Sequence, residues 1–218
     1  MILDKFRLDG KIAIVTGSNT GLGQGFCVAL AEAGARVLGV GRRDSEETLA
    51  MIGKDKFAYM IADLGDVGCV DKIIKTALDT YGGIDILVNN AGIIRREDSL
   101  NFTEKDWDEV MNVNLKTLFF LSQAAARVMV EQNRGGKIIN VASMLSYQGG
   151  IRVPSYTSSK SAVKGLTMTL ANEWAKYGIN VNAIAPGYMA TNNTEALRND
   201  PDRSKAILDR IPAGRWGT

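Results

Sequence analysis

The sequence predicts one α/β domain in which helices cover both faces of a doubly wound parallel sheet. Two observations support this prediction. Short, continuous apolar runs alternate with amphipathic stretches along the 218 residues, and strands that helices bury on both faces are apolar throughout. This alternation of strands and helices is typical of a parallel sheet with right-handed crossovers. The length suits one domain, and we expect residues 1–218 to form it.

Six apolar runs are expected to be strands, because they are short, apolar and set apart by turn residues and helical stretches. They are residues 11–16, 35–41, 57–63, 84–90, 137–143 and 179–186.

The stretches between these strands carry helix signals. Gly34 is placed to end the first helix. Thr103 is placed to cap a later one, with acidic residues in the first turn, where the helix dipole favours anions. The expected helices are residues 22–33, 45–52, 67–81, 103–132 with a break near 112–114, and 154–177. Beyond the last strand we expect a loop, a short helix near 202–210, and a role for residues 187–211 as a substrate lid.

The composition limits the functional classes. The chain is 45% hydrophobic and 23% charged, with a net charge of +2 and no long run of like charge, so nothing favours nucleic acid or a membrane surface. No run approaches the roughly 20 apolar residues of a spanning helix, and the N-terminal residues lack the apolar core of a signal peptide. The two cysteines fit a reducing compartment, so we expect a cytoplasmic enzyme.

The chain contains no histidine. This excludes Ser-His-Asp hydrolysis and zinc bound by histidine, and we expect no metal site. Proton transfer must therefore use tyrosine, lysine, aspartate, glutamate, cysteine or serine.

A glycine-rich turn joins the first strand to the first helix. Gly17, Gly21 and Gly23 lie there beside Asn19 and Leu22. Glycines let the backbone approach a pyrophosphate, and the helix N-terminus supplies free N–H groups, as in a Rossmann-like dinucleotide site. The spacing differs from the common G-x-G-x-x-G pattern, so a plain strand-to-helix turn remains an alternative.

The ends of the next strands are candidates for the adenosine side of the cofactor. The second strand is followed by Arg42 and Arg43, with no acid at its end, so the arginines either pair with the 2′-phosphate of NADP or face solvent. We expect Asp63 and Leu64 after the third strand to contact the adenine. The end of the fourth strand adds three candidates for cofactor contact, Asn90, Ala91 and Gly92. Asn90 could instead hold the turn with its side chain.

Tyr156 and Lys160 are one helical turn apart, downstream of Ser143. A free tyrosine has a pKa near ~10 and is a poor base at neutral pH. A neighbouring ammonium favours the phenolate and lowers that pKa. Ser143 can bind the substrate oxygen while Tyr156 gives or takes its proton. The pattern predicts hydride transfer between a nicotinamide cofactor and an alcohol or ketone.

These motifs resemble the short-chain dehydrogenase/reductase family over nearly the whole chain. The resemblance implies that Asn114 holds a water of a proton relay and that Lys160 also binds the nicotinamide ribose. Thr191 would then bond the carboxamide, and a homotetramer is expected. The residues that match are Thr16-Gly17-x-x-x-Gly21-x-Gly23, Asn89-Asn90-Ala91-Gly92, Asn114, Ser143, Tyr156-x-x-x-Lys160 and the cofactor-site pair Pro186-Gly187.

A narrower likeness points to bacterial family members of uronate breakdown. It implies reduction of 3-deoxy-D-glycero-2,5-hexodiulosonate, a keto sugar acid, to 2-keto-3-deoxy-D-gluconate. It narrowly favours NAD(H) over NADP(H). The alternatives are a gluconate 5-dehydrogenase, another short-chain ketone reductase and, more distantly, a nucleotide-binding sensor without turnover. The stretches that carry the likeness are residues 91–98, 104–114, 142–156, 172–194 and 209–217.

A sugar acid carries a carboxylate, which arginine binds in a bidentate fork. Arg95 and Arg96 follow the fourth strand, and Arg152 lies between Ser143 and Tyr156. We favour Arg152 and one of the other two as carboxylate ligands; solvent or subunit contacts are the alternative. Weaker candidates for the pocket are Gln148, Met189 and Asn193. Family members usually continue for about thirty residues beyond Thr218, so we expect their seventh strand to be absent.

Overall fold

The computed structural model describes residues 1–218, except for the side chain of Asn193. Its centre is a six-stranded parallel sheet with the strand order β3-β2-β1-β4-β5-β6. All six expected strands are confirmed, although most end one or two residues earlier than expected. They are β1 (Ile12–Thr16), β2 (Arg36–Gly41), β3 (Phe57–Ile61), β4 (Ile86–Asn89), β5 (Gly136–Val141) and β6 (Ile179–Ile184).

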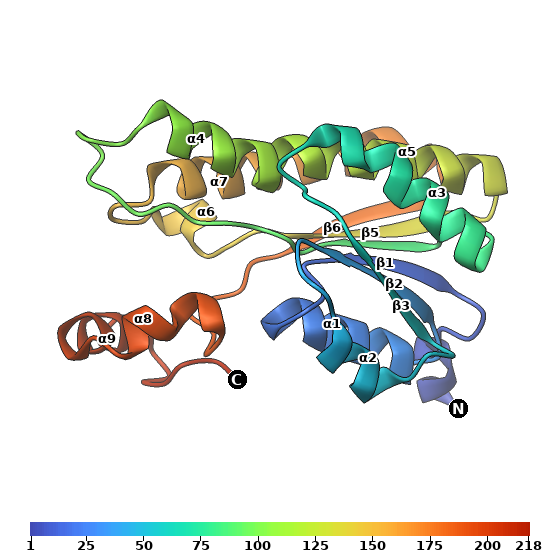
Figure 1. The fold of residues 1–218 in the computed structure, drawn as a ribbon, viewed down its shortest axis with the longest axis horizontal. Helices are drawn as coiled ribbons and strands as arrows, with labels where there is room; N and C mark the ends of the chain where they lie inside the picture. Colours follow the sequence, from blue (N-terminus) through green and yellow to red (C-terminus); the bar gives the residue numbers. More distant parts are fainter.

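Helices cover both faces of the sheet, as Figure 1 shows. Two of them, α1 (Gly21–Glu32) and α2 (Glu46–Ile52), lie on one face. The other face carries α3 (Val70–Tyr81), α4 (Glu104–Met111), α5 (Leu118–Gln132) and α7 (Pro154–Trp174). Four 3-10 helices span Ile2–Phe6, Val67–Cys69, Ala175–Tyr177 and Asn192–Thr194, and α6 is Leu145–Gln148. Within the described chain, no helix is long and apolar enough to cross a membrane.

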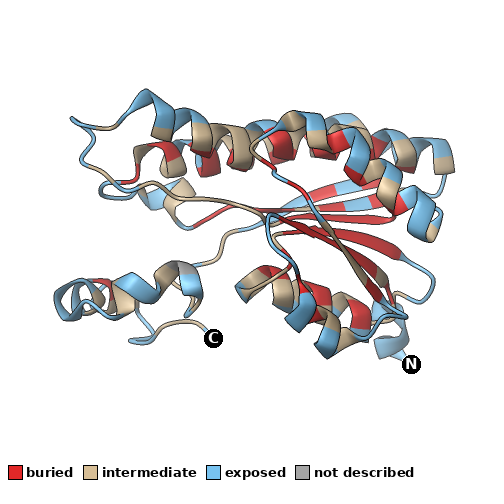
Figure 2. Cartoon of the chain, in the orientation of Figure 1, coloured by how far each residue is buried: buried red, intermediate tan, exposed pale blue. Residues whose placement is uncertain are grey.

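Alternate residues of the central strands contribute to two large cores, one on each face of the sheet. Ile14, Leu38 and Leu87 belong to the core under α3 and α5, whereas Val15 and Val37 belong to the core under α1. Figure 2 shows this buried sheet between the two helix layers. Burial on both faces explains why the strands are continuously apolar in the sequence.

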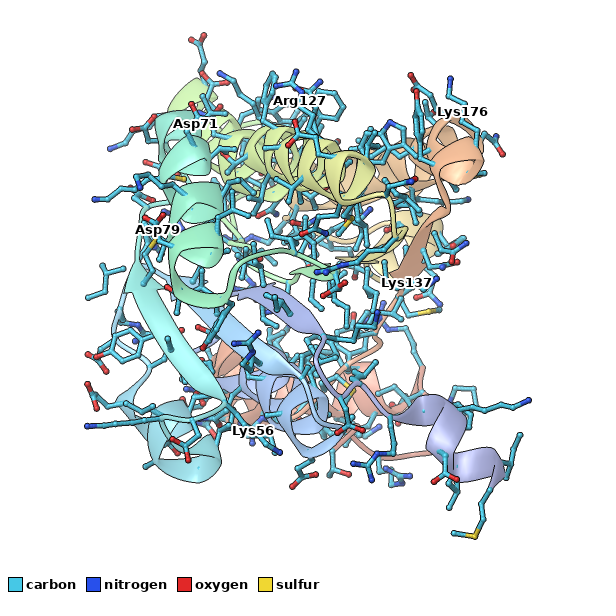
Figure 3. The ribbon with its side chains drawn as sticks, turned by 90° about the vertical axis from the view of Figure 1, so that its right-hand side faces the viewer. Lys56, Asp71, Asp79, Arg127, Lys137 and Lys176 are labelled. Atoms are coloured by element: carbon cyan, nitrogen blue, oxygen red, sulfur yellow. The ribbon has the colours of Figure 1, made fainter. Side chains whose placement is uncertain are left out.

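Charged side chains lie outside these cores. Figure 3 views the molecule from the amino edge of the sheet, with Lys137 near the start of β5 and Arg127 on the outer side of α5. Of the residues that the structure describes, two charged ones are buried, Lys160 on α7 and Asp85 at this edge. The carboxylate of Asp85 accepts from the N–H of Ile12 at 2.9 Å and pairs with Arg134 at 2.9 Å. The hydrogen bond and the ion pair stabilise a carboxylate whose burial without partners would cost free energy.

The helical region after Thr103 contains the expected break. Thr103 Oγ1 accepts from the N–H of Asp106 at 3.1 Å, which confirms the N-cap. The break is a π-helical segment, Asn112–Thr117, between α4 and α5. Such segments offset the side chains that follow them and are frequent at functional sites.

The chain beyond β6 forms a loop closed at its base. The N–H of Gly217 donates to Tyr188 O at 2.9 Å, and that of Ala190 donates to Gly217 O at 2.8 Å. The loop carries α8 (Glu195–Arg198) and α9 (Pro201–Leu208). The short helix expected near 202–210 is therefore present, whereas α8 was not expected. Figure 1 places both helices beyond the carboxyl ends of the strands.

Candidate active site

The carboxyl edge of the sheet gathers most of the candidate residues. β1 pairs in parallel with both β2 and β4, so the chain winds away from β1 in both directions. Open α/β sheets bind ligands outside the strand ends at such a reversal.

The glycine-rich turn has the shape expected of a pyrophosphate cradle. Gly17 has a φ of 71°, in the left-handed region that glycine adopts without strain. A β-carbon at Gly23 would collide with the carbonyl oxygen of Gly17, so no larger residue fits there. The N-cap of α1, Thr20, makes no side-chain capping bond. The first N–H groups of this helix thus face a tight glycine turn, which fits an anionic phosphate group.

A buried hydroxyl network supports this turn, and the sequence analysis missed it. The hydroxyls of Ser18 and Ser45 are 2.9 Å apart, and Thr48 Oγ1 donates to Ser18 O at 2.9 Å. All three residues are fully or almost fully buried. The network joins the turn to the start of α2, directly after Arg42 and Arg43. No sequence motif signals it, because the partners meet only when the strands pair.

The end of β2 lies on the expected adenosine side, where Gly41 itself is buried. Arg42 and Arg43 are exposed, and a β-carbon at Gly41 would meet no atom outside its chain neighbours closer than 3.8 Å. Asn19 lies beside this strand end, with Oδ1 3.9 Å from that β-carbon position.

The end of β3 offers a polar and an apolar group. Asp63 Oδ1 accepts from the N–H of Gly65 at 2.9 Å and is otherwise exposed. Leu64 is buried in the core instead of facing solvent, and it lines a small cavity with Asn89 and Ala91. Only Asp63 therefore presents a polar side chain that suits the adenine amino group.

Asn90 holds the turn after β4, the alternative that the sequence left open. Its Nδ2 donates to Thr16 O at 2.9 Å and to Gly17 O at 3.3 Å, and its N–H donates to Thr16 Oγ1 at 3.0 Å. The N–H of Ala91 reaches the same hydroxyl at 3.0 Å. Asn90 thus fixes the glycine-rich turn against β4.

Ser143, Tyr156 and Lys160 come together as the sequence predicts. Ser143 follows β5 and is buried, while Tyr156 and Lys160 lie on α7. Lys160 Nζ lies 5.8 Å from the centre of the Tyr156 ring and donates to Val141 O at 2.6 Å.

Burial dominates the titration of both groups. It raises the pKa of Tyr156, and a hydrogen bond with Ser143 and the charge of Arg96 oppose this rise. Burial also lowers the pKa of Lys160 to about 8. In the protein without a bound cofactor, the expectation that Lys160 lowers the pKa of the phenol is therefore wrong. Desolvation raises this pKa more than any group lowers it, and the groups that lower it are Ser143 and Arg96.

Asn114 ties the loop after β4 to α7. Its Oδ1 accepts from the N–H of Ile93 at 2.8 Å, and its Nδ2 donates to Ile93 O at 3.0 Å and to Ser159 Oγ at 3.2 Å. A β-carbon at Gly92 would lie 3.3 Å from Asn114 Oδ1 and 3.5 Å from Lys160 Nζ. Asn114 and Lys160 thus flank the same small residue, a position that fits a relay of protons.

The three candidate arginines have different surroundings. Arg95 pairs with Glu109 at 2.7 Å and with Asp106 at 3.5 Å, both on α4, so two acids balance its charge. Arg152 is half-exposed and forms an ion pair with Glu97 at 3.5 Å, which balances its charge. Arg96 is the member of the set whose charge acts on Tyr156.

The remaining candidates are spread over the carboxyl edge. Gln148 is exposed at the end of α6, and Met189 lies against Gly217 at the base of the loop beyond β6. A β-carbon at Gly21 would lie 3.4 Å from Thr191 Cγ2, so the start of this loop approaches the glycine-rich turn.

Three other candidates lie near the start of the same loop. Gly187 is exposed, and Pro186 O accepts from the N–H of Met144 at 3.1 Å. The side chain of Asn193 lies outside the described residues. Among the side chains that are described, no group of acidic residues and cysteines could hold a metal ion.

Comparison with known proteins agrees with this geometry. The family model described as short chain dehydrogenase matches residues 11–202. The 2-dehydro-3-deoxy-D-gluconate 5-dehydrogenase of Dickeya dadantii is 60% identical over all of this chain and 87% of its own length.

Two solved structures share both fold and sequence. A protein of Agrobacterium tumefaciens with bound NADP has a TM-score of 0.90 and 59% identity, over 97% of this chain and 85% of the other. The gluconate 5-dehydrogenase of Burkholderia cenocepacia, in complex with NADP and tartrate, has a TM-score of 0.91 and 39% identity, over all of this chain and 86% of the other.

The buried ammonium of Lys160 predicts a pH dependence of stability. Its pKa is about 8 in the folded protein against an ordinary 10.5, so between these values the unfolded chain binds more protons. Folding stability therefore rises with pH in this window. Without cofactor, we expect the unfolding free energy of the parent, relative to Lys160→Met, to rise by about 2 kcal/mol from pH 7.5 to 10. Urea titrations of both proteins measure this difference, and parallel pH curves would contradict it.

Proposed function

Because the chain belongs to the short-chain dehydrogenase/reductase family, we propose that it reduces 3-deoxy-D-glycero-2,5-hexodiulosonate to 2-keto-3-deoxy-D-gluconate in uronate breakdown. The observation that carries the chemistry is the meeting of Ser143, Tyr156 and Lys160 beside the glycine-rich turn. The substrate is supported by the 60% identity to the Dickeya dadantii enzyme and by the positive charge of Arg96 near Tyr156.

The residues of this site support each step of ketone reduction. A nicotinamide cofactor, when bound, supplies the hydride. The raised pKa keeps Tyr156 protonated at neutral pH, so its phenol can give a proton to the substrate oxygen. Ser143 lies where its hydroxyl can stabilise charge developing on that oxygen. Lys160 lies beside the Tyr156 ring and can return a proton to the phenol, and Asn114, which flanks Gly92 together with Lys160, can hold a water of that relay.

The substitution Tyr156→Phe tests this role. It removes the proton donor and keeps the ring, so we expect kcat to fall by a factor of about 10² to 10⁴ while the affinity for the reduced cofactor is retained. Tyr177→Phe, on the 3-10 helix after α7, is the matched control and keeps the parent rate. Cofactor absorbance follows turnover, and fluorescence titration follows binding. Full activity of the Tyr156 variant would refute the enzyme proposal.

A gluconate 5-dehydrogenase is the second candidate, because the Burkholderia cenocepacia enzyme shares the fold at 39% identity. Gluconate with an oxidised cofactor and the diulosonate with a reduced one are therefore assayed side by side. The higher kcat/KM assigns the substrate. A sensor without turnover would respond to neither while still binding the cofactor.

We further infer that the chain accepts NADP(H). The resemblance narrowly favours NAD(H), but β2 ends without an acid, and Arg42 and Arg43 are exposed directly after Gly41. Guanidinium groups bind a 2′-phosphate in bidentate fashion. Relatives solved with NADP support the same cofactor.

Replacing both arginines tests this cofactor choice. In the double variant Arg42→Ala/Arg43→Ala, we expect the KM for NADPH to rise about tenfold or more, because charged hydrogen bonds to the phosphate are lost. NADH lacks the 2′-phosphate, so its KM should stay within about twofold of the parent value. Initial rates with each cofactor measure the ratio. Equal shifts for both cofactors would argue against phosphate recognition.

We also propose a cytoplasmic homotetramer. Four large apolar side chains remain exposed on the helix layer of α4, α5 and α7: Trp107, Phe120 and Val130 are each 38% exposed, and Met168 is 56% exposed. Exposed apolar groups gathered on one layer favour contact with other copies of the chain. Sedimentation equilibrium should give about four times the chain mass of 23.6 kDa. A monomer at micromolar concentration would contradict the proposal.

A further inference from the structure

A small internal cavity lies at the carboxyl ends of β1 and β4. Its polar lining residues are Thr16, the last residue of β1, Asn89, the last of β4, and Thr117, the last of the π-helical segment. Each is at most 3% exposed. The other lining residues are apolar: Leu64, Ala91, Val113, Leu118 and Leu121. The volume of the cavity is about 10 Å³, so it suits one water molecule and no larger ligand.

Hydrogen bonds of fixed direction set the orientation of the Asn89 amide. Thr167 Oγ1 gives its proton to Val163 O at 2.7 Å, so it can only accept from Asn140 Nδ2, at 3.0 Å. Asn140 therefore turns its Oδ1 toward Asn89, and Asn89 Nδ2 is the donor of the 2.8 Å bond between the two amides. The same Nδ2 donates to Ser122 Oγ at 2.9 Å. Both protons of this amide are thus used, and Asn89 Oδ1 remains as an acceptor.

Two buried oxygen atoms of the lining residues have no hydrogen-bond partner among the described residues. They are Asn89 Oδ1 and Thr117 Oγ1. Thr16 Oγ1 accepts from two backbone N–H groups of the loop after β4, and its own bond to Val88 O is 3.4 Å long, beyond the usual range of such bonds. Its proton is therefore available to a closer acceptor. Buried polar atoms cost free energy without a partner, and ordered water commonly supplies one.

We propose that this cavity binds one internal water molecule, which joins β1, β4 and the π-helical segment. The water donates to Asn89 Oδ1 and accepts from the hydroxyls of Thr16 and Thr117. It then has three protein partners, the typical number for a buried water. Asn114 and Lys160 do not line the cavity, so this water is distinct from the water of the proton relay.

The water connects the two sides of the site. Thr16 accepts from the N–H groups of Asn90 and Ala91 and so holds the loop after β4 beside the glycine-rich turn. Thr117 belongs to the same π-helical segment as Asn114. A molecule that bonds to both threonines therefore couples the expected cofactor cradle to the segment of the proton relay.

High-resolution crystallography of the parent protein tests the site directly. We expect an ordered water within hydrogen-bonding distance of Asn89 Oδ1, Thr16 Oγ1 and Thr117 Oγ1. Threonine hydroxyls in helices can instead donate to the carbonyl four residues earlier, which for Thr117 is that of Val113. A dry cavity, or a Thr117 hydroxyl bonded to Val113 O, would overturn the proposal.

The substitution Thr117→Val removes the hydroxyl and nearly keeps the shape of the side chain. We expect the water to be lost and the equilibrium constant for unfolding to rise about tenfold, because Asn89 Oδ1 is left without a partner. Thr169→Val, on the exposed side of α7, is the matched control and keeps the parent value. Thr117→Ser keeps the hydroxyl and therefore the water, which separates loss of the bond from a general packing defect. Urea titrations measure the constants, and crystal structures of the variants show the water.

Amide hydrogen exchange tests whether the water joins the segments. The N–H groups of Asn90 and Ala91 donate to Thr16 Oγ1, so we expect both to exchange severalfold faster in Thr117→Val and at the parent rate in Thr169→Val. Parent-like exchange together with parent-like unfolding in Thr117→Val would contradict the proposal. These measurements need no turnover, so they test the water site even if the proposed substrate is wrong.

Discussion

The site depends on the bond between the carboxyl ends of β1 and β4. Thr16 Oγ1 accepts from the N–H groups of Asn90 and Ala91, and the Asn90 amide donates back to Thr16 O. These bonds fix the glycine-rich turn against the loop after β4 at the place where the sheet order reverses. The turn leaves no space for a side chain at Gly23, so small shifts of this junction would close the cradle. A polar pair between two strands thus sets the geometry of the whole carboxyl edge.

Burial gives the catalytic groups their protonation states. It disfavours the phenolate of Tyr156 and the ammonium of Lys160, so both groups tend toward their neutral forms. Ser143 and Arg96 oppose this tendency at Tyr156. Because desolvation is the larger effect, the phenol of Tyr156 keeps its proton at neutral pH, which suits a proton donor in ketone reduction.

The sequence predicted what depends on local pattern. Continuous apolar runs marked the central strands because both of their faces are buried, and the same pattern located the more exposed edge strands β3 and β6. The four-residue spacing placed Tyr156 and Lys160 on one helix face. It could not predict contacts between distant segments. Arg95 is neutralised by acids of α4, and the Ser18–Ser45 bond forms only when β1 and β2 pair. The effect of the Arg203 charge on the pKa of Arg96 likewise depends on where the loop beyond β6 lies.

The catalytic residues and the loop beyond β6 are held by different parts of the fold. Ser143, Tyr156 and Lys160 are fixed by the sheet and α7, so their geometry is set before any ligand arrives. The loop that carries α8 and α9 is tied at its base through Tyr188 and Gly217, and its Thr191 approaches the glycine-rich turn. A change in this loop can therefore alter the surroundings of the carboxyl edge without moving the groups that transfer the proton.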